Sequence, residues 1–146
     1  METLDLLHRD EHLVAVHKPA GLLVHRSPID RRETRFALQL VRDQIGQRVY
    51  PVHRLDKPTS GVLLFALSPA VAARLAAAFA SGAVTKDYLA VVRGVPPLAG
   101  EIDHPLQEEP DRLDGYPDDA PRGVQAALTL YPVSYTHLTL PTNREV

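Results

Sequence analysis

A short segment near the middle of the chain concentrates the residue types that could carry out chemistry. Residues 52–61 are VHRLDKPTSG, so Asp56 lies between the cations Arg54 and Lys57 in a loop that contains Pro, Ser and Gly. Nearby positive charge favours an ionised carboxylate, which can act as a nucleophile or as a general base. A solvated turn with an incidental ion pair has the same spacing, so the segment alone leaves both interpretations open.

The elements around this segment are predicted to place it at the end of a sheet. Gly61–Leu67 is an apolar run with the length of a buried strand, and Tyr50–His53 is a short strand candidate on the other side. His12–His17 and Leu22–His25 are predicted as two further extended pieces, separated by the turn residues of 18–21. Asp56 would therefore follow one strand and precede another.

Two helices are predicted to accompany these strands. Thr34 can cap the first helix, which ends at Gly46 and has four apolar residues at helical spacing: Phe36, Leu40, Val41 and Ile45. Ser68 can cap the second, with Pro69 at its first position and an alanine-rich run over 70–80 that Gly82 ends. The remaining chain is punctuated by Pro and Gly, with strand candidates at Tyr88–Val92, near Glu101–His104 and at Gln125–Tyr131. This order predicts an α+β fold: a mixed, largely antiparallel sheet with helices packed on it.

Composition excludes several classes of protein. The chain has 146 residues, 45% of them hydrophobic and 23% charged, and its longest apolar stretch is too short to span a bilayer. It has no Cys, which excludes disulfides, thiolate metal sites and Cys nucleophiles, and fits a reducing compartment, most simply the cytoplasm. Residues 1–100 carry a net charge of +4 and residues 101–146 a net charge of −6. A phosphate-bearing partner would be drawn to the first part, although uneven surface charge alone does not identify a partner.

The segment around Asp56 resembles the catalytic motif of the RluA-type pseudouridine synthases. That motif is matched by His53-Arg54-Leu55-Asp56 followed by Thr59-Ser60-Gly61. Upstream, Lys18-Pro19-x-Gly21 with Val24-His25 is similar to the family's first motif, and downstream Lys86-x-Tyr88 resembles its tyrosine position. Further similarity at 24–31, 41–47 and 106–109 points to a branch that modifies tRNA, whereas close relatives modify ribosomal RNA. The resemblance covers about residues 3–131.

The resemblance implies an enzyme that isomerises a specific uridine in RNA, most simply tRNA, to pseudouridine. Asp56 would be the nucleophile, attacking the sugar or the base, and no cofactor, metal, membrane or obligate protein partner is implied. Because a stacked uridine is out of reach, it must be extruded from the RNA helix. Arg54 would fill the space that the base leaves, and Tyr88 would lie against the uracil. His53 and Thr59 are further expected RNA- or substrate-binding residues, with a loop-fixing role as the alternative for both.

Other chemistries are less well supported by the residue pattern. Seven His residues suggest a metal site, but the chain has no HExxH-like pattern. Ser60, His53 and Asp56 contain the residue types of a hydrolase triad, but they lie within eight residues and lack a G-x-S-x-G motif.

The strongest rival is a catalytically incomplete fragment that at most binds RNA. The family's later H-Q-[IL]-R motif, whose Arg pairs with the catalytic Asp, has no match here. After Tyr131 the sequence changes character, so we expect 1–131 to be the N-terminal part of a catalytic domain and 132–146 to be a non-native tail. A chain truncated in this way is expected to be marginally folded and nearly inactive.

Overall fold

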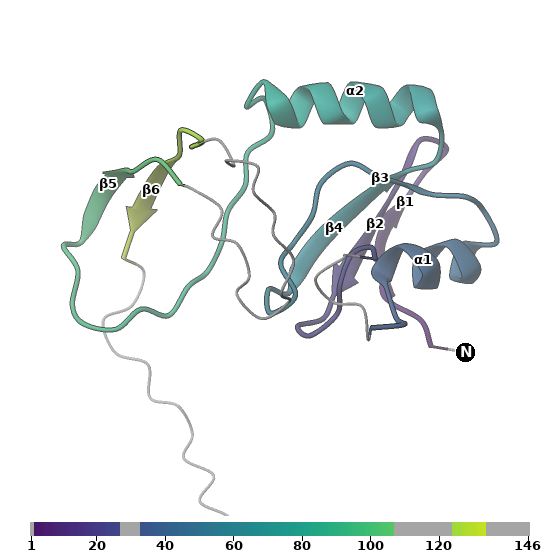
Figure 1. The fold of residues 1–146 in the computed structure, drawn as a ribbon, viewed down its shortest axis with the longest axis horizontal. Helices are drawn as coiled ribbons and strands as arrows, with labels where there is room; N and C mark the ends of the chain where they lie inside the picture. The colour runs from purple at the N-terminus through teal and green to yellow at the C-terminus, as the bar shows by residue number, and fades with distance from the viewer. Residues whose placement is uncertain (1, 27–32, 107–123, 134–146) are drawn as a thin grey trace, which may run out of the picture. The chain divides into compact units, whose positions relative to one another are not determined.

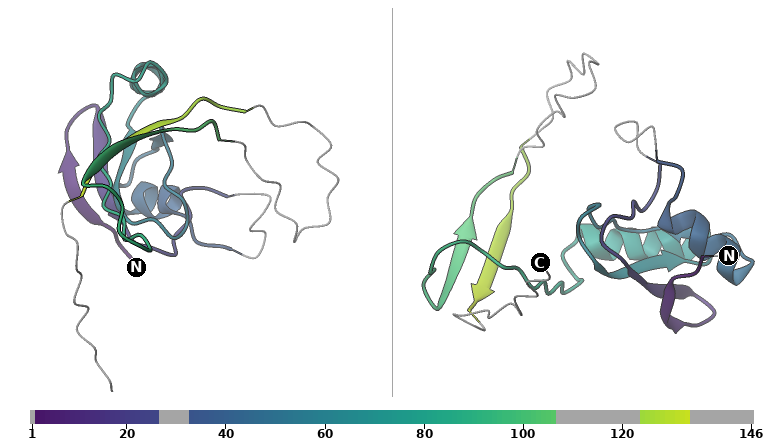
Figure 2. Two further views of the ribbon diagram at one scale, coloured as in Figure 1. Left: turned by 90° about the vertical axis from the view of Figure 1, so that its left-hand side faces the viewer. Right: turned by 90° about the horizontal axis from the view of Figure 1, so that it is seen from below.

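The computed structural model describes residues 2–26, 33–106 and 124–133, and it divides into two compact units, Met1–Asp87 and Tyr88–Val146. The expected tail of 132–146 lies almost entirely outside the described residues. The first unit contains the segment around Asp56 and is an antiparallel sheet with two helices (Figures 1 and 2). No helix in the described ranges is long and apolar enough to cross a bilayer.

The sheet of the first unit has the strand order β1-β2-β4-β3. Its strands are β1 (Asp5–Arg9), β2 (Leu13–Lys18), β3 (Tyr50–Pro51) and β4 (Gly61–Ala66). All pairs between these four strands are antiparallel. In the central pair Val14 lies opposite Phe65, and Lys18 lies opposite Gly61. The predicted strands at 12–17 and 61–67 are thus confirmed, and the strand predicted at 50–53 is shorter than expected.

The core lies on one face of the central strands. Because side chains alternate along a strand, Val14 and Val16 of β2 share a face with Leu63 and Phe65 of β4, and all four are fully buried. The same alternation places Lys18 on this face, where it is fully buried as well. The central pair therefore carries both the apolar core and one buried cation.

Helix α1 (Ala37–Ile45) packs on this core through Ala37 and Val41. The prediction that Thr34 caps it is wrong, because Phe36 is the N-cap residue and makes no side-chain capping bond. Backbone carbonyls of the preceding segment satisfy the first-turn amides instead: the N–H of Ala37 donates to Leu23 at 2.8 Å and the next N–H to Val24 at 3.0 Å. The strand predicted at 22–25 is thereby reduced to one isolated bridge between Leu23 and Phe36.

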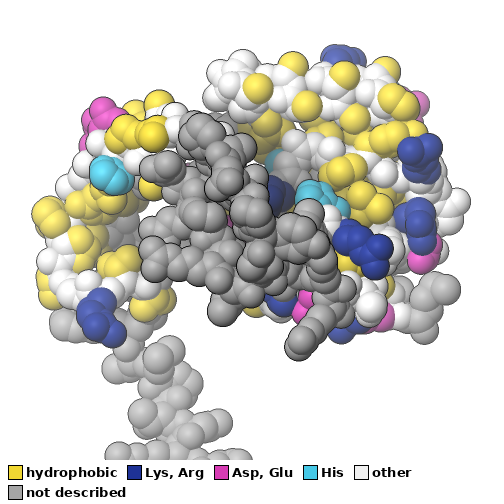
Figure 3. All heavy atoms as spheres, in the orientation of Figure 1, with side chains coloured by type: hydrophobic (Ala, Val, Ile, Leu, Met, Phe, Trp, Pro, Cys, Tyr) yellow, Lys and Arg dark blue, Asp and Glu magenta, His cyan; other side chains and the backbone are white. Residues whose placement is uncertain are grey.

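Helix α2 (Pro69–Ala80) begins as its sequence predicts. The Ser68 Oγ accepts from the N–H of Val71 at 3.3 Å, Pro69 occupies the first turn, and Gly82 after the helix has a φ of 72°. The helix contacts β3 and β4, but none of its residues is buried. Figure 3 shows hydrophobic side chains exposed along it.

The described part of the second unit contains a two-stranded antiparallel sheet. It consists of β5 (Ala99–Asp103) and β6 (Leu128–Pro132), which bear out the strands predicted near 101–104 and 125–131 within a few residues (Figure 1). The strand predicted at Tyr88–Val92 is wrong, because that segment is exposed and pairs with no strand among the described residues.

Gly100 leaves the space that the Tyr131 ring of the paired strand occupies. A Cβ at position 100 would lie 2.7 Å from Cζ and 2.8 Å from Cε1 of the Tyr131 ring, and 2.5 Å from its hydroxyl oxygen. We expect Gly100→Ala to displace this ring and weaken the β5–β6 pair, whereas Gly94→Ala meets no atom within 4 Å but is strained by its φ of 92°. Amide chemical shifts of residues 99–103 and 128–132 would report the change. Unchanged shifts in Gly100→Ala would contradict the expectation.

Candidate active site

Asp56 lies in the turn that leads into β4. Its backbone carbonyl accepts from the N–H of Thr59 at 3.0 Å, while buried Leu55 anchors the preceding residue in the core. The carboxylate is 76% exposed, and its Oδ1 lies 3.9 Å from Nη2 of Arg54, whose side chain is 65% exposed. Both groups are therefore open to a ligand, and this loose ion pair contributes little to stability.

The turn is held in place by the segment that follows β2. The carbonyl of Lys57 accepts from the N–H of Gly21 at 2.7 Å and from Nζ of Lys18 at 3.3 Å. The same Nζ donates to the carbonyls of Pro19 and Leu22, at 3.0 and 2.7 Å. The segment 18–22 thus supports the turn of Asp56, because it fixes the backbone carbonyl of the residue that follows Asp56.

Among the described residues, no carboxylate accepts a hydrogen bond from the buried ammonium group of Lys18, which donates to three backbone carbonyls. Burial lowers its pKa below the ordinary value of 10.5, and the charge of Asp56 opposes that shift. The positive charge of Lys18 therefore acts on Asp56 from beneath the turn without a direct contact.

A second cation fixes the outer side of the turn. Nζ of Lys57 lies 2.8 Å from Oε1 of Glu33, and this hydrogen bond lowers the pKa of the Glu33 carboxyl. Glu33 lies only four residues before α1, so the ion pair joins the entry of that helix to the residue after Asp56.

His53 contacts β4 and α2 through its side chain. Its Nε2 accepts from the N–H of Leu64 at 2.9 Å, and its ring stacks on Phe79 with centroids 4.7 Å apart. The sequence left this residue between substrate binding and fixing the loop. These contacts support the second role.

The other expected site residues are placed differently. Thr59 is half-buried and closes the turn through its N–H, which again supports a role in loop shape. Tyr88 is 62% exposed and belongs to the second unit. The first unit thus brings together Arg54, Asp56 and Thr59, with His53 behind them.

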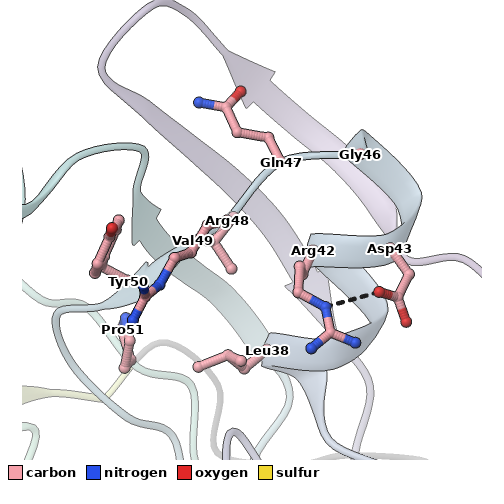
Figure 4. Close-up of a pocket in the computed structure, with 9 residues that line it drawn as sticks. All are labelled: Leu38, Arg42, Asp43, Gly46, Gln47, Arg48, Val49, Tyr50 and Pro51. Carbon is pink, nitrogen blue, oxygen red and sulfur yellow. Dashed lines mark hydrogen bonds and ion pairs between the residues drawn. The ribbon is translucent and has the colours of Figure 1, made fainter.

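An open pocket of about 800 Å3 is lined by residues of α1 and of the segment 46–51 that follows it (Figure 4). None of the expected site residues lines this pocket. Arg42 and Asp43 are paired at its rim at 2.7 Å, and the Arg48 guanidinium lies 5.1 Å from the centre of the Tyr50 ring. The described ranges contain no group of three His, Asp or Glu side chains that could hold a metal ion.

The supporting role of two residues, Lys18 and Glu33, was not predicted from the sequence. Lys18 occupies the next inward position after Val14 and Val16, so the strand alternation itself could have indicated its burial. Glu33 carries no such signal, because its pairing with Lys57 depends on how α1 is docked.

Comparison with known proteins decides the family of this chain. Residues 12–140 match the model of the family described as RNA pseudouridylate synthase. The chain belongs to this family. The turn that presents Asp56 thus lies within the matched residues of a pseudouridylate synthase domain of the RluA type.

Similar RNA pseudouridylate synthases are long relative to this chain. It is 54% identical over 130 residues to tRNA pseudouridine synthase C of Pasteurella multocida, covering 88% of this chain and 53% of that protein. The protein of the same name from Vibrio cholerae is 46% identical over 142 residues, covering 97% and 58%. The solved structure of human RNA Pseudouridylate Synthase Domain Containing 4 matches with a TM-score of 0.65 and 32% identity, covering 88% and 53%. The chain thus spans about half the length of the curated relatives it matches.

Proposed function

We propose that this chain carries the nucleophile of an enzyme that converts a uridine in tRNA to pseudouridine. The observation that carries the proposal is the exposed Asp56 carboxylate on a turn fixed by Lys18, Gly21 and Thr59. Isomerisation breaks the N1–C1′ bond of uridine and forms a C5–C1′ bond, so the C5 proton is lost and N1 gains a proton. No electrons are exchanged with a second reactant, and an ionised carboxylate at a defined position is the group that the attack requires.

Arg54 and Tyr88 have complementary roles in this proposal. Arg54 is close enough to Asp56 to fill the gap left by an extruded uridine, where its planar guanidinium can stack and donate hydrogen bonds. Unstacking the uridine costs on the order of a few kcal/mol, which such contacts would offset. Tyr88 would stack on the uracil face once the base has left the helix. The names of the curated relatives support tRNA as the RNA substrate.

Release of tritium from tRNA transcripts labelled at C5 of uridine tests the proposal directly. We expect the chain to bind an unmodified transcript and to release tritium slowly, so that single-turnover conditions with protein in excess are needed to detect the release. A transcript in which cytidine replaces each candidate uridine in turn would identify the position. Absence of both binding and release would overturn the proposal.

RNA binding without turnover is the second candidate function. It would apply to residues 1–146 taken by themselves, which do not contain the later H-Q-[IL]-R motif whose Arg would pair with Asp56. Binding of the transcript with no tritium release would select this function. Preference for ribosomal RNA fragments over tRNA in the same assay would change the substrate and leave the reaction class unchanged.

A further inference from the structure

His53 occupies the point at which the β3–β4 ladder stops. The regular pairs end at Pro51 opposite Phe65, and the next residue of β4 toward Asp56 is Leu64. The N–H of Leu64 donates to Nε2 of His53 at 2.9 Å, so a side chain takes over where the strand residues end. Among the described residues, this is the last hydrogen bond to β4 before the chain reaches Asp56.

The contact defines the state of the imidazole. Nε2 can accept only when it carries no proton, so the ring proton of the neutral form must be on Nδ1. If Nε2 were protonated, its N–H would face the N–H of Leu64. Both groups are donors, so the bond to Leu64 would break. The ring could then no longer hold the segment of 52–56 against β4.

The surroundings of the ring favour the neutral form. Burial, and then the charge of Lys86, lower the pKa of His53 below its ordinary value of 6.5. From α2 the ring meets the apolar face of Phe79, and β4 contributes a backbone amide and no charged side chain. The charged neighbours on its own segment are Arg54 and Asp56.

We propose that His53 is the positioning residue of Asp56: its neutral imidazole ties the segment 52–56 to β4, and protonation of the ring releases that tie. The effect on uridine isomerisation rests on the proposed function, whereas the pH-dependent release of His53 from β4 does not. Because the unfolded chain binds this proton more tightly, stability falls as the pH drops from 6.5 through the lowered pKa of His53, and it is fully present above 6.5.

Nuclear magnetic resonance of the 15N-labelled chain between pH 8 and pH 5 tests this proposal without RNA. We expect a protonated Nδ1 and an unprotonated Nε2 at pH 8. We also expect the amides of Leu64 and Asp56 to shift with the same midpoint as the His53 ring, below 6.5. A protonated Nε2 at pH 8, or flat Leu64 and Asp56 amide shifts while the ring titrates, would overturn the proposal.

Two variants separate positioning from general stability. In His53→Gln the amide oxygen can still accept from Leu64 but does not titrate, so we expect the pH dependence at Leu64 and Asp56 to disappear. His17→Gln, at an exposed position of β2, should leave that pH dependence unchanged. A retained Leu64 and Asp56 titration in His53→Gln would contradict the proposal. Failure of tritium release, by contrast, bears on the proposed function alone.

Discussion

The Asp56→Asn variant is expected to lose uridine isomerisation by at least about a thousandfold, because a neutral amide is a far poorer nucleophile than a carboxylate. The variant should fold normally, since the side chain is 76% exposed and makes only a 3.9 Å ion pair with Arg54. Asparagine has nearly the same shape, and the backbone bond to Thr59 is retained. Single-turnover tritium release and transcript binding would measure the two properties separately.

RNA binding should be unchanged or tighter in this variant, because it removes a negative charge from a surface that would face phosphates in the proposed function. Asp43→Asn is the matched control: it makes the same substitution at an exposed carboxylate on α1, paired with Arg42. We expect the control to turn over at the rate of the parent chain. Equal tritium release by Asp56→Asn and Asp43→Asn would remove Asp56 from the role of nucleophile.

The Lys18→Met variant is expected to destabilise the first unit. Methionine keeps the apolar stem but removes the donor to the carbonyls of Pro19 and Leu22, and the carbonyl of Lys57 loses one donor while keeping Gly21. An unsatisfied buried acceptor costs about 1–3 kcal/mol. Relief of the cost of burying an ammonium group offsets part of this, so we expect a net loss of about 1–3 kcal/mol in the free energy of unfolding.

The pH dependence of stability provides a second signature of Lys18. Because burial lowers the pKa of Lys18, the unfolded chain binds its proton more tightly than the folded chain does. Stability should therefore rise with pH between that lowered pKa and 10.5, and Lys18→Met should lack this rise. Urea unfolding monitored by circular dichroism at several pH values measures both effects. Arg74→Met, at an exposed position of α2, serves as control. Identical pH curves for Lys18→Met and the parent chain would contradict the assignment.

The elements that were predictable are those with a strong local signal. The run at 61–67 is apolar and bounded by turns, and Ser68-Pro69 combines a capping oxygen with a residue that needs no N–H. Strand β1 carries no such signal, because all five of its residues are exposed and alternation is absent. Tyr88–Val92 has strand-forming side chains, but strand propensity reflects packing against neighbours, and the large side chains of this segment are mostly exposed.

The site likewise contains features that local sequence predicts and features that depend on the fold. Arg54, Asp56 and Thr59 lie within six residues of the sequence, so their grouping could be predicted without the fold. The bond of His53 to Leu64 and the pairing of Lys57 with Glu33 span 11 and 24 residues. Both depend on the docking of strands and helices, which local pattern does not specify. The resemblance predicts Asp56 as the nucleophile, but it does not predict the network that holds the turn.

The two sheets differ in strand pairing and in burial, and this difference affects how the stability of the chain should be measured. Strand β2 is paired on both sides and carries buried residues, whereas β5 and β6 pair only with each other among the described strands, and most of their residues are exposed. Two-stranded ribbons are marginally stable in water. Amide protons of β5 and β6 should therefore exchange with solvent by local opening, whereas exchange of those in β2 requires the first unit to unfold. One melting temperature therefore does not describe this chain. A thermal scan is expected to combine the opening of the β5–β6 pair with the unfolding of the first unit.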